Sequence, residues 1–201
     1  MSRTSKLIQQ LSLPNLQLRV LPANGDCLYI AIATALHGVG TQNHTVSSLR
    51  NLVSDTVDEE TFQSFNIANS AGLTGYEFMS STRTLEALKS RLIIKGTDAN
   101  GKLCIWAEDF AIRTIVNALG ITLCIFDEQA RDTSSRFCAI RPEVEGDWEG
   151  VVVVQRSRRS HYNLICDGAN TLIFAESIMR KFNLVNDCAP ETKRRKTEKN
   201  R

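Results

Sequence analysis

The chain has 201 residues, of which 42% are hydrophobic and 23% are charged, which is the composition of a globular domain and excludes a fully disordered chain. No apolar run reaches the roughly 20 residues that span a bilayer, and the N-terminal segment MSRTSKLIQQ lacks the apolar core of a secretion signal. We therefore expect a cytoplasmic protein that is not associated with a membrane, with one domain over residues 1–189.

The net charge of +2 is unevenly distributed along the chain. Six of the 24 basic residues and two of the 22 acidic residues fall in the segment 191–201, so the remaining residues carry a small negative balance. We expect residues 190–201 to form a basic, disordered tail. Lys193-Arg194-Arg195-Lys196 within it matches a minimal nuclear-import signal, so a nuclear location stays open.

Periodicity predicts the elements of the N-terminal part of the chain. A short helix is expected over 4–13 and a strand over 16–21. A turn with Gly25 then leads into residues 27–37, which are apolar nearly all round and predict a buried central helix. The next helix is expected over 45–57, with apolar residues recurring on one face.

The remaining elements change from helical to strand periodicity. Residues 58–80 fit no element, whereas 82–94 and 107–119 each predict an amphipathic helix. Successive strands and a closing helix follow, over residues 121–126, 136–140, 151–155, 161–165 and 175–183. Helices followed by strands indicate an α+β fold around one sheet.

Cys27 differs from the other five cysteines because it stands between a glycine turn and the start of a buried helix. Partial positive charge and unpaired N–H groups at a helix N-terminus lower a thiol pKa, and the same N–H groups can receive an oxyanion. A buried core cysteine opening an apolar helix is the alternative interpretation.

A nucleophilic cysteine needs a base, and the chain has three histidines. His37 lies about 15 Å along the helix from Cys27, and His44 lies in a polar loop. His161 opens a predicted strand, and alternation places Asn163 on the same face. The amide oxygen of Asn163 can then accept a hydrogen bond from the imidazole, which is the nucleophile, base and orienter arrangement of cysteine proteases.

Three segments resemble the ovarian tumour (OTU) family of cysteine deubiquitinases. The segment NGDCLYIAIATALHG is similar to the family's nucleophile motif, and Trp106-Ala107-Glu108-Asp109-Phe110 is similar to its middle block. His161-Tyr162-Asn163-Leu164-Ile165 is similar to its closing histidine block. The resemblance covers about residues 17–167. It implies a papain-like fold with a central mixed or antiparallel sheet packed between helices.

The resemblance also implies the roles of individual residues. Cys27 is the expected nucleophile, His161 the general base and Asn163 the orienting residue. Asn24 and Asp26, which flank the turn, are also expected among the catalytic residues, and the N–H groups of Asp26 and Cys27 are expected to bind the oxyanion. The family usually has Asp at the first of these positions and Asn at the second, so the two residue types are exchanged here.

The implied reaction is hydrolysis of isopeptide or peptide bonds at the C-terminal glycine of ubiquitin, without metal or cofactor. The partner is ubiquitin, polyubiquitin or a ubiquitin-like modifier, and Glu108 and Asp109 are candidates to meet the basic C-terminal stretch of ubiquitin. A solvated helix N-terminus explains these two carboxylates equally well. Monomer is the default assembly.

Two alternatives from other functional classes stay open. One is a ubiquitin-binding OTU-like domain with weak or no catalysis, which the exchange of Asn24 and Asp26 favours. The other is a nucleic-acid partner recognised by basic residues, against which the near-neutral body argues.

Overall fold

The computed structural model describes residues 16–37, 44–96, 104–130, 137–143, 150–157, 161–168 and 173–174. The helices expected over 4–13 and 175–183 and the tail 190–201 lie outside these described residues. No helix within the described ranges combines the length and the apolar character needed to cross a bilayer.

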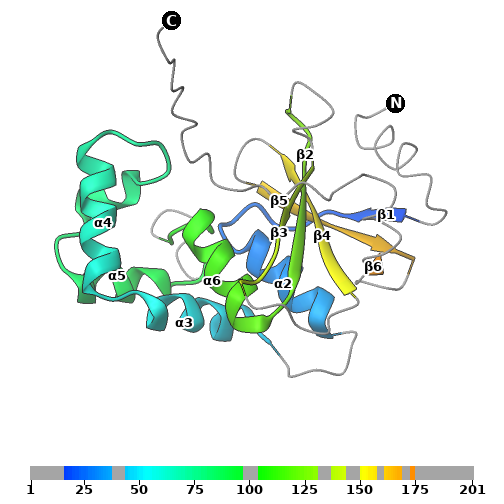
Figure 1. The fold of residues 1–201 in the computed structure, drawn as a ribbon. Coiled ribbons are helices and arrows are strands. Elements are labelled where there is room, and N and C mark those ends of the chain that lie inside the picture. Colours follow the sequence, from blue (N-terminus) through cyan, green and yellow to red (C-terminus); the bar gives the residue numbers. More distant parts are fainter. Residues whose placement is uncertain are drawn as a thin grey trace, which may run out of the picture.

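One mixed sheet forms the centre of the fold (Figure 1). Its strands follow the spatial order β1 (Leu16–Arg19), β5 (His161–Asp167), β4 (Gly150–Ser157), β2 (Thr122–Asp127) and β3 (Phe137–Ile140), and the short β6 (Ile173–Phe174) also pairs with β4. Strands β2 and β4 run parallel, and the other described pairs are antiparallel. The predicted α+β class with a mixed sheet is confirmed.

The four valines of β4 explain why this strand lies inside the sheet. Val151, Val152, Val153 and Val154 are all buried, and β-branched side chains pack well on a pleated surface. Val152 and Val154 join the main hydrophobic core together with residues of the helices, whereas Val151 and Val153 point to the opposite face. A continuous apolar run is therefore the pattern of a strand covered on both faces.

Helix α2 (Cys27–His37) packs on β4 and β5 and also contacts α3, and burial against both the sheet and a helix explains why its residues are apolar nearly all round. Helix α3 (Val46–Thr56) contacts α2, α5 (Leu85–Leu92) and α6 (Asp109–Leu119). A capping box between Thr45 and Ser48 starts α3, and Gly120 in the left-handed region ends α6. The helices expected over 27–37, 45–57, 82–94 and 107–119 are all present, with ends that differ by up to three residues.

The segment 58–80, for which periodicity predicted no element, contains α4 (Glu59–Ser70) and most of the short 3-10 helix η1 (Glu77–Ser81). The Asp58 side chain caps α4 by accepting from the Thr61 N–H at 2.8 Å. Helix α4 packs on η1 and α5 and projects away from the sheet (Figure 1). We call residues 58–81 the helical arm.

Candidate active site

The structure brings the Cys27 thiol to the start of β5. Cys27 is the first residue of α2, and only 2% of its surface is exposed. Its Sγ accepts a hydrogen bond from the backbone N–H of Tyr162 at 3.4 Å, across 135 residues of sequence. Because Tyr162 directly follows His161, the thiol and the histidine proposed as its base lie at the same end of β5.

The imidazole of His161 is held by the side chain of Asn163. His161 Nε2 lies 3.1 Å from Asn163 Oδ1. The same oxygen accepts from the Leu21 backbone N–H at 3.0 Å, and Asn163 Nδ2 donates to Gln155 Oε1 at 3.2 Å. A backbone N–H can only donate, so the contact with Leu21 fixes which end of the amide faces His161.

This orientation of Asn163 determines the tautomer of a neutral His161. Since Oδ1 is an acceptor, His161 Nε2 must carry the proton, which leaves the lone pair on Nδ1. His161 Nδ1 is buried and has no hydrogen-bond partner among the described residues. The ring therefore has one nitrogen fixed by Asn163 and a second, basic nitrogen that is left for another proton donor.

Burial has the largest effect on the protonation of Cys27. It raises the pKa of the thiol above its ordinary value, while the N–H groups of Tyr162, Leu28 and Cys27 itself lower it. The Asp26 carboxylate adds a smaller increase. The N–H groups at the start of the helix thus lower the thiol pKa in the expected direction, but desolvation of the buried thiol outweighs them.

Asn24 and Asp26, which the resemblance places among the expected catalytic residues, both form contacts that hold the loop before Cys27. Asn24 Oδ1 accepts from the Asp26 N–H at 3.1 Å, so in this structure the N–H is already engaged and does not point to an empty oxyanion site. Asp26 is 1% exposed, and its carboxylate forms an ion pair with Arg50 at 2.7 Å.

The sequence matches no family model and no curated protein, but the structure is similar to solved structures. An OTU deubiquitinase from Wolbachia pipientis wMel matches with a TM-score of 0.51 and 13% identity, over 84% of this chain and 98% of that chain. An OTU domain in complex with ubiquitin gives 0.49 and 14%, over 85% of each chain. The OTU domain of OTUD1 gives 0.49 and 12%, over 82% and 93%.

The chain has the OTU fold.

Two buried polar residues of this OTU fold were missed by the sequence analysis. Arg50 is 0% exposed and Gln155 is 2% exposed. Both carried a signal: Arg50 lies four residues after Val46 on the apolar face of α3, and Gln155 ends the run of valines in β4. A polar residue at a position that the pattern assigns to the core needs a buried partner, and these partners are Asp26 and Asn163.

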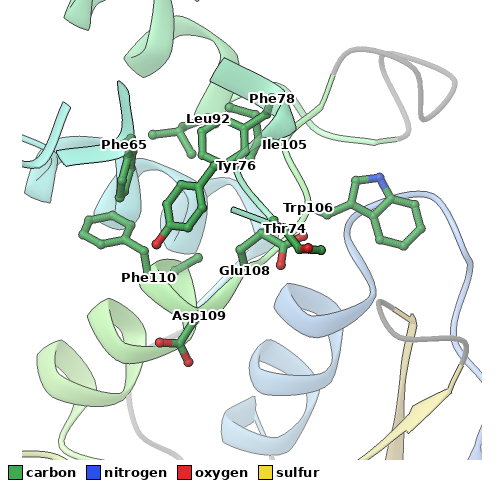
Figure 2. A pocket seen from close by; sticks show the side chains of 12 residues that line it. Phe65, Thr74, Tyr76, Phe78, Leu92, Ile105, Trp106, Glu108, Asp109 and Phe110 are labelled. Atoms are coloured by element: carbon green, nitrogen blue, oxygen red, sulfur yellow. The ribbon is translucent and has the colours of Figure 1, made fainter. Parts of the chain in front are cut away.

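Beside the OTU-fold site, the helical arm and the start of α6 enclose a hollow of about 80 Å³. Figure 2 shows Phe65, Tyr76 and Phe110 gathered on one side of the hollow and Trp106 on the other, with Glu108 between them. Partial burial and the nearby Glu77 carboxylate raise the pKa of Glu108. Acidic groups thus lie next to Trp106, which itself packs near Gly25 in the loop before Cys27.

Proposed function

We propose that this chain is a cysteine-type deubiquitinase that hydrolyses isopeptide or peptide bonds at the C-terminal glycine of ubiquitin. The observation that carries the proposal is the position of the His161 imidazole relative to the thiol. Asn163 fixes His161 Nε2, and Tyr162, the next residue along β5, donates its N–H to Cys27 Sγ. The OTU fold, which the chain shares with a Wolbachia deubiquitinase, supports the same reaction class.

The reaction follows from the roles of these groups. His161 Nδ1 takes the thiol proton, and the Cys27 sulfur attacks the glycine carbonyl carbon. The tetrahedral intermediate then collapses: the C–N bond breaks, and the imidazolium gives its proton to the leaving amine. A water molecule, deprotonated by His161, attacks the thioester and releases the ubiquitin carboxylate and the thiol. Asn163 keeps the ring oriented and stabilises the imidazolium through both steps.

The carboxylates beside Trp106 support ubiquitin as the substrate. The C-terminal stretch of ubiquitin is basic. Glu108 and Asp109 line the hollow described above, and Glu77 lines a neighbouring hollow that shares Trp106 and Glu108 with it. Glu108 also lies near enough to influence the pKa of Tyr162, the residue that contacts Cys27. A basic segment bound along these carboxylates leads toward the thiol.

Substrate must also open the site, because Cys27 is 2% exposed. An extended peptide end can reach the sulfur only when side chains around it rotate. Release of the Asp26 N–H from Asn24 Oδ1 in the same movement would supply an oxyanion donor. Binding energy from the body of ubiquitin is the source for this rearrangement.

The test is incubation with ubiquitin that carries a thiol-reactive group at its C-terminus, followed by intact mass. We expect one adduct in the wild type, none in Cys27→Ala and slower formation in His161→Ala. Cys166→Ala is the matched control, because Cys166 is a buried thiol in β5 away from the proposed nucleophile. An adduct that survives Cys27→Ala would contradict the assignment of the nucleophile.

A second candidate is a ubiquitin-binding domain with weak or no catalysis. The burial of Cys27 and the raised pKa of its thiol favour it. The exchange of Asn24 and Asp26 supports it less, because Asp26 now has a partner in Arg50. Titration of Cys27→Ala with ubiquitin distinguishes the two: binding without any wild-type adduct favours this candidate, and an adduct rules it out.

A further inference from the structure

Arg50 is a fully buried arginine whose hydrogen-bonding groups are all used. Nε donates to Asp26 Oδ1 at 2.8 Å, and Nη2 donates to the Gly25 carbonyl at 2.9 Å. Nη1 donates to the carbonyls of Leu92 and Ile105 at 3.0 and 3.1 Å, and the Nη2 contact with Asp26 completes the five donors.

Two of these acceptors belong to the loop that presents the nucleophile. Gly25 and Asp26 directly precede Cys27, so the guanidinium forms hydrogen bonds within two residues of the thiol. The guanidinium also stacks on the ring of Tyr29, 4.4 Å from its centroid, in the first turn of the same helix. Arg50 therefore joins α3, α5 and the segment at Ile105 to both sides of Cys27.

The loop is also packed tightly against Cys104 and Gly96. A Cβ on Gly25, whose φ is +91°, would collide with Cys104 Sγ, and a Cβ on Gly96 would collide with the Asn24 carbonyl. Cys104 Sγ contacts that same carbonyl at 3.5 Å. The loop thus has one well-defined path, and the planar fork of Arg50 supplies the directional contacts along it.

Stability alone does not account for a buried pair of this kind. Replacing a buried ion pair by apolar side chains is often neutral or stabilising, because both charges must be desolvated. The position of Asp26 next to the thiol gives the pair another consequence. An unpaired carboxylate there would disfavour the thiolate, and Arg50 supplies its counter-charge.

We propose that Arg50 is a positioning residue for Cys27: its guanidinium fixes the loop Asn24–Cys27 and neutralises the Asp26 carboxylate beside the thiol. The inference rests on the proposed function for its catalytic consequence. Its chemical consequence, the reactivity of Cys27, does not depend on ubiquitin. The titratable and charged groups around the loop are Asp26, Tyr29, Arg50, Cys104, His161 and Tyr162.

The test measures the pH dependence of Cys27 alkylation by iodoacetamide, read by peptide mass so that the other thiols are separated. In Arg50→Gln the midpoint should move up by about one pH unit, because Asp26 is left unpaired. In Asp26→Asn it should move down, because the Arg50 charge is left uncompensated. The double variant should return to the wild-type midpoint. Loss of packing alone does not move the midpoint in opposite directions.

Arg50→Lys tests the hydrogen-bonding geometry of the guanidinium separately from its charge. It keeps the charge but loses two of the five donors, so the midpoint should stay in place. On a fluorogenic ubiquitin amide, kcat should fall about tenfold with KM unchanged, because Arg50 is fully buried and cannot touch ubiquitin. Arg91→Lys is the matched control, since Arg91 also donates to the carbonyl of another element, that of Phe78.

The outcomes separate this inference from the proposed function. If the wild type does not cleave ubiquitin but the midpoints shift as described, the proposed function fails and the role of Arg50 stands. Equal midpoints in wild type, Asp26→Asn and the double variant would overturn the role of Arg50, whatever the activity. Should Arg50→Gln fail to fold, the alkylation midpoints of Asp26→Asn and of the double variant still test the role of Arg50.

Discussion

Asn163 is the residue on which the geometry of the site depends most. Its oxygen binds both the Leu21 N–H and His161 Nε2, and its amide nitrogen binds Gln155. We expect Asn163→Ala to lower kcat for ubiquitin hydrolysis by at least ~10², because the imidazole loses its orientation. The buried Leu21 N–H also loses its acceptor, which destabilises the fold by about 1–3 kcal/mol in denaturant unfolding.

Gln155→Ala is the matched variant, because Gln155 contacts Asn163, which in turn contacts the His161 ring. Leu21 and His161 still hold Asn163 in this variant, so kcat should fall about tenfold or less. A loss in Gln155→Ala as large as that in Asn163→Ala would contradict the view that the Leu21 N–H fixes the amide.

Gly25 allows a second comparison at the level of single residues. Gly25 and Gly72 both have positive φ, of 91° and 70°, but only Gly25 is packed against other atoms. Gly72→Ala should therefore show only the backbone strain, about 1–2 kcal/mol, whereas Gly25→Ala should lose clearly more stability and also the ubiquitin adduct. Equal unfolding free energies for the two variants would show that the clash with Cys104 Sγ adds no cost to the backbone strain.

At the scale of elements, the helical arm depends on one aromatic cluster. The ring of Phe65 in α4 contacts Tyr76, Phe78 and Phe110, with centroids 5.1 to 5.9 Å apart. Phe65→Ala should cost about 3–5 kcal/mol and speed amide hydrogen exchange over residues 59–81. Ile67→Ala on the same helix removes a side chain that is 70% exposed, and should change stability by less than about 0.5 kcal/mol.

The elements that were predicted correctly are those with strong periodicity or strong boundaries. Helix α6 has its apolar residues at helical spacing and ends at Gly120, and β4 is an unbroken run of valines. Helix α4 was missed because its buried residues are few and its aromatic partners come from η1 and α6, which no local window contains. Tertiary packing, not propensity, stabilises this helix.

The site was predictable only in part for a similar reason. Residue types and their order pointed to Cys27, His161 and Asn163, and strand alternation predicted the hydrogen bond that the structure shows between the last two. Their catalytic roles stay predictions. The partners Arg50 and Gln155 depend on contacts 24 and 8 residues apart in the sequence, and the burial that raises the pKa of Cys27 depends on the whole fold.

For the whole molecule, buried acidic groups predict how stability changes with pH. Burial raises the pKa of Tyr29, Cys124 and Tyr162 to about 12, from ordinary values of 10.0, 9.0 and 10.0. The unfolded chain therefore releases these protons first as pH rises. Stability should be complete below about pH 9 and fall between about pH 9 and 12, by up to about 1.4 kcal/mol per pH unit for each group.

Urea unfolding at neutral and several alkaline pH values measures this loss. Cys124→Val is the informative variant, because Cys124 is fully buried in β2 and valine is of similar size. Its stability should fall less steeply above pH 9 than that of the wild type. Parallel curves for the two proteins would mean that Cys124 ionises equally in the folded and unfolded chains.

The long sequence separation of the contacts at the start of β5 has a consequence for biosynthesis. The Leu21 N–H that fixes Asn163 lies 142 residues before it in the sequence. Cys27 lies 135 residues before Tyr162, whose N–H contacts its sulfur. A ribosome adding about 5–20 residues per second needs roughly 7–30 s to make the intervening chain. The thiol is thus synthesised long before the histidine proposed as its base, and a nascent or prematurely terminated chain that lacks β5 carries the proposed nucleophile without that histidine.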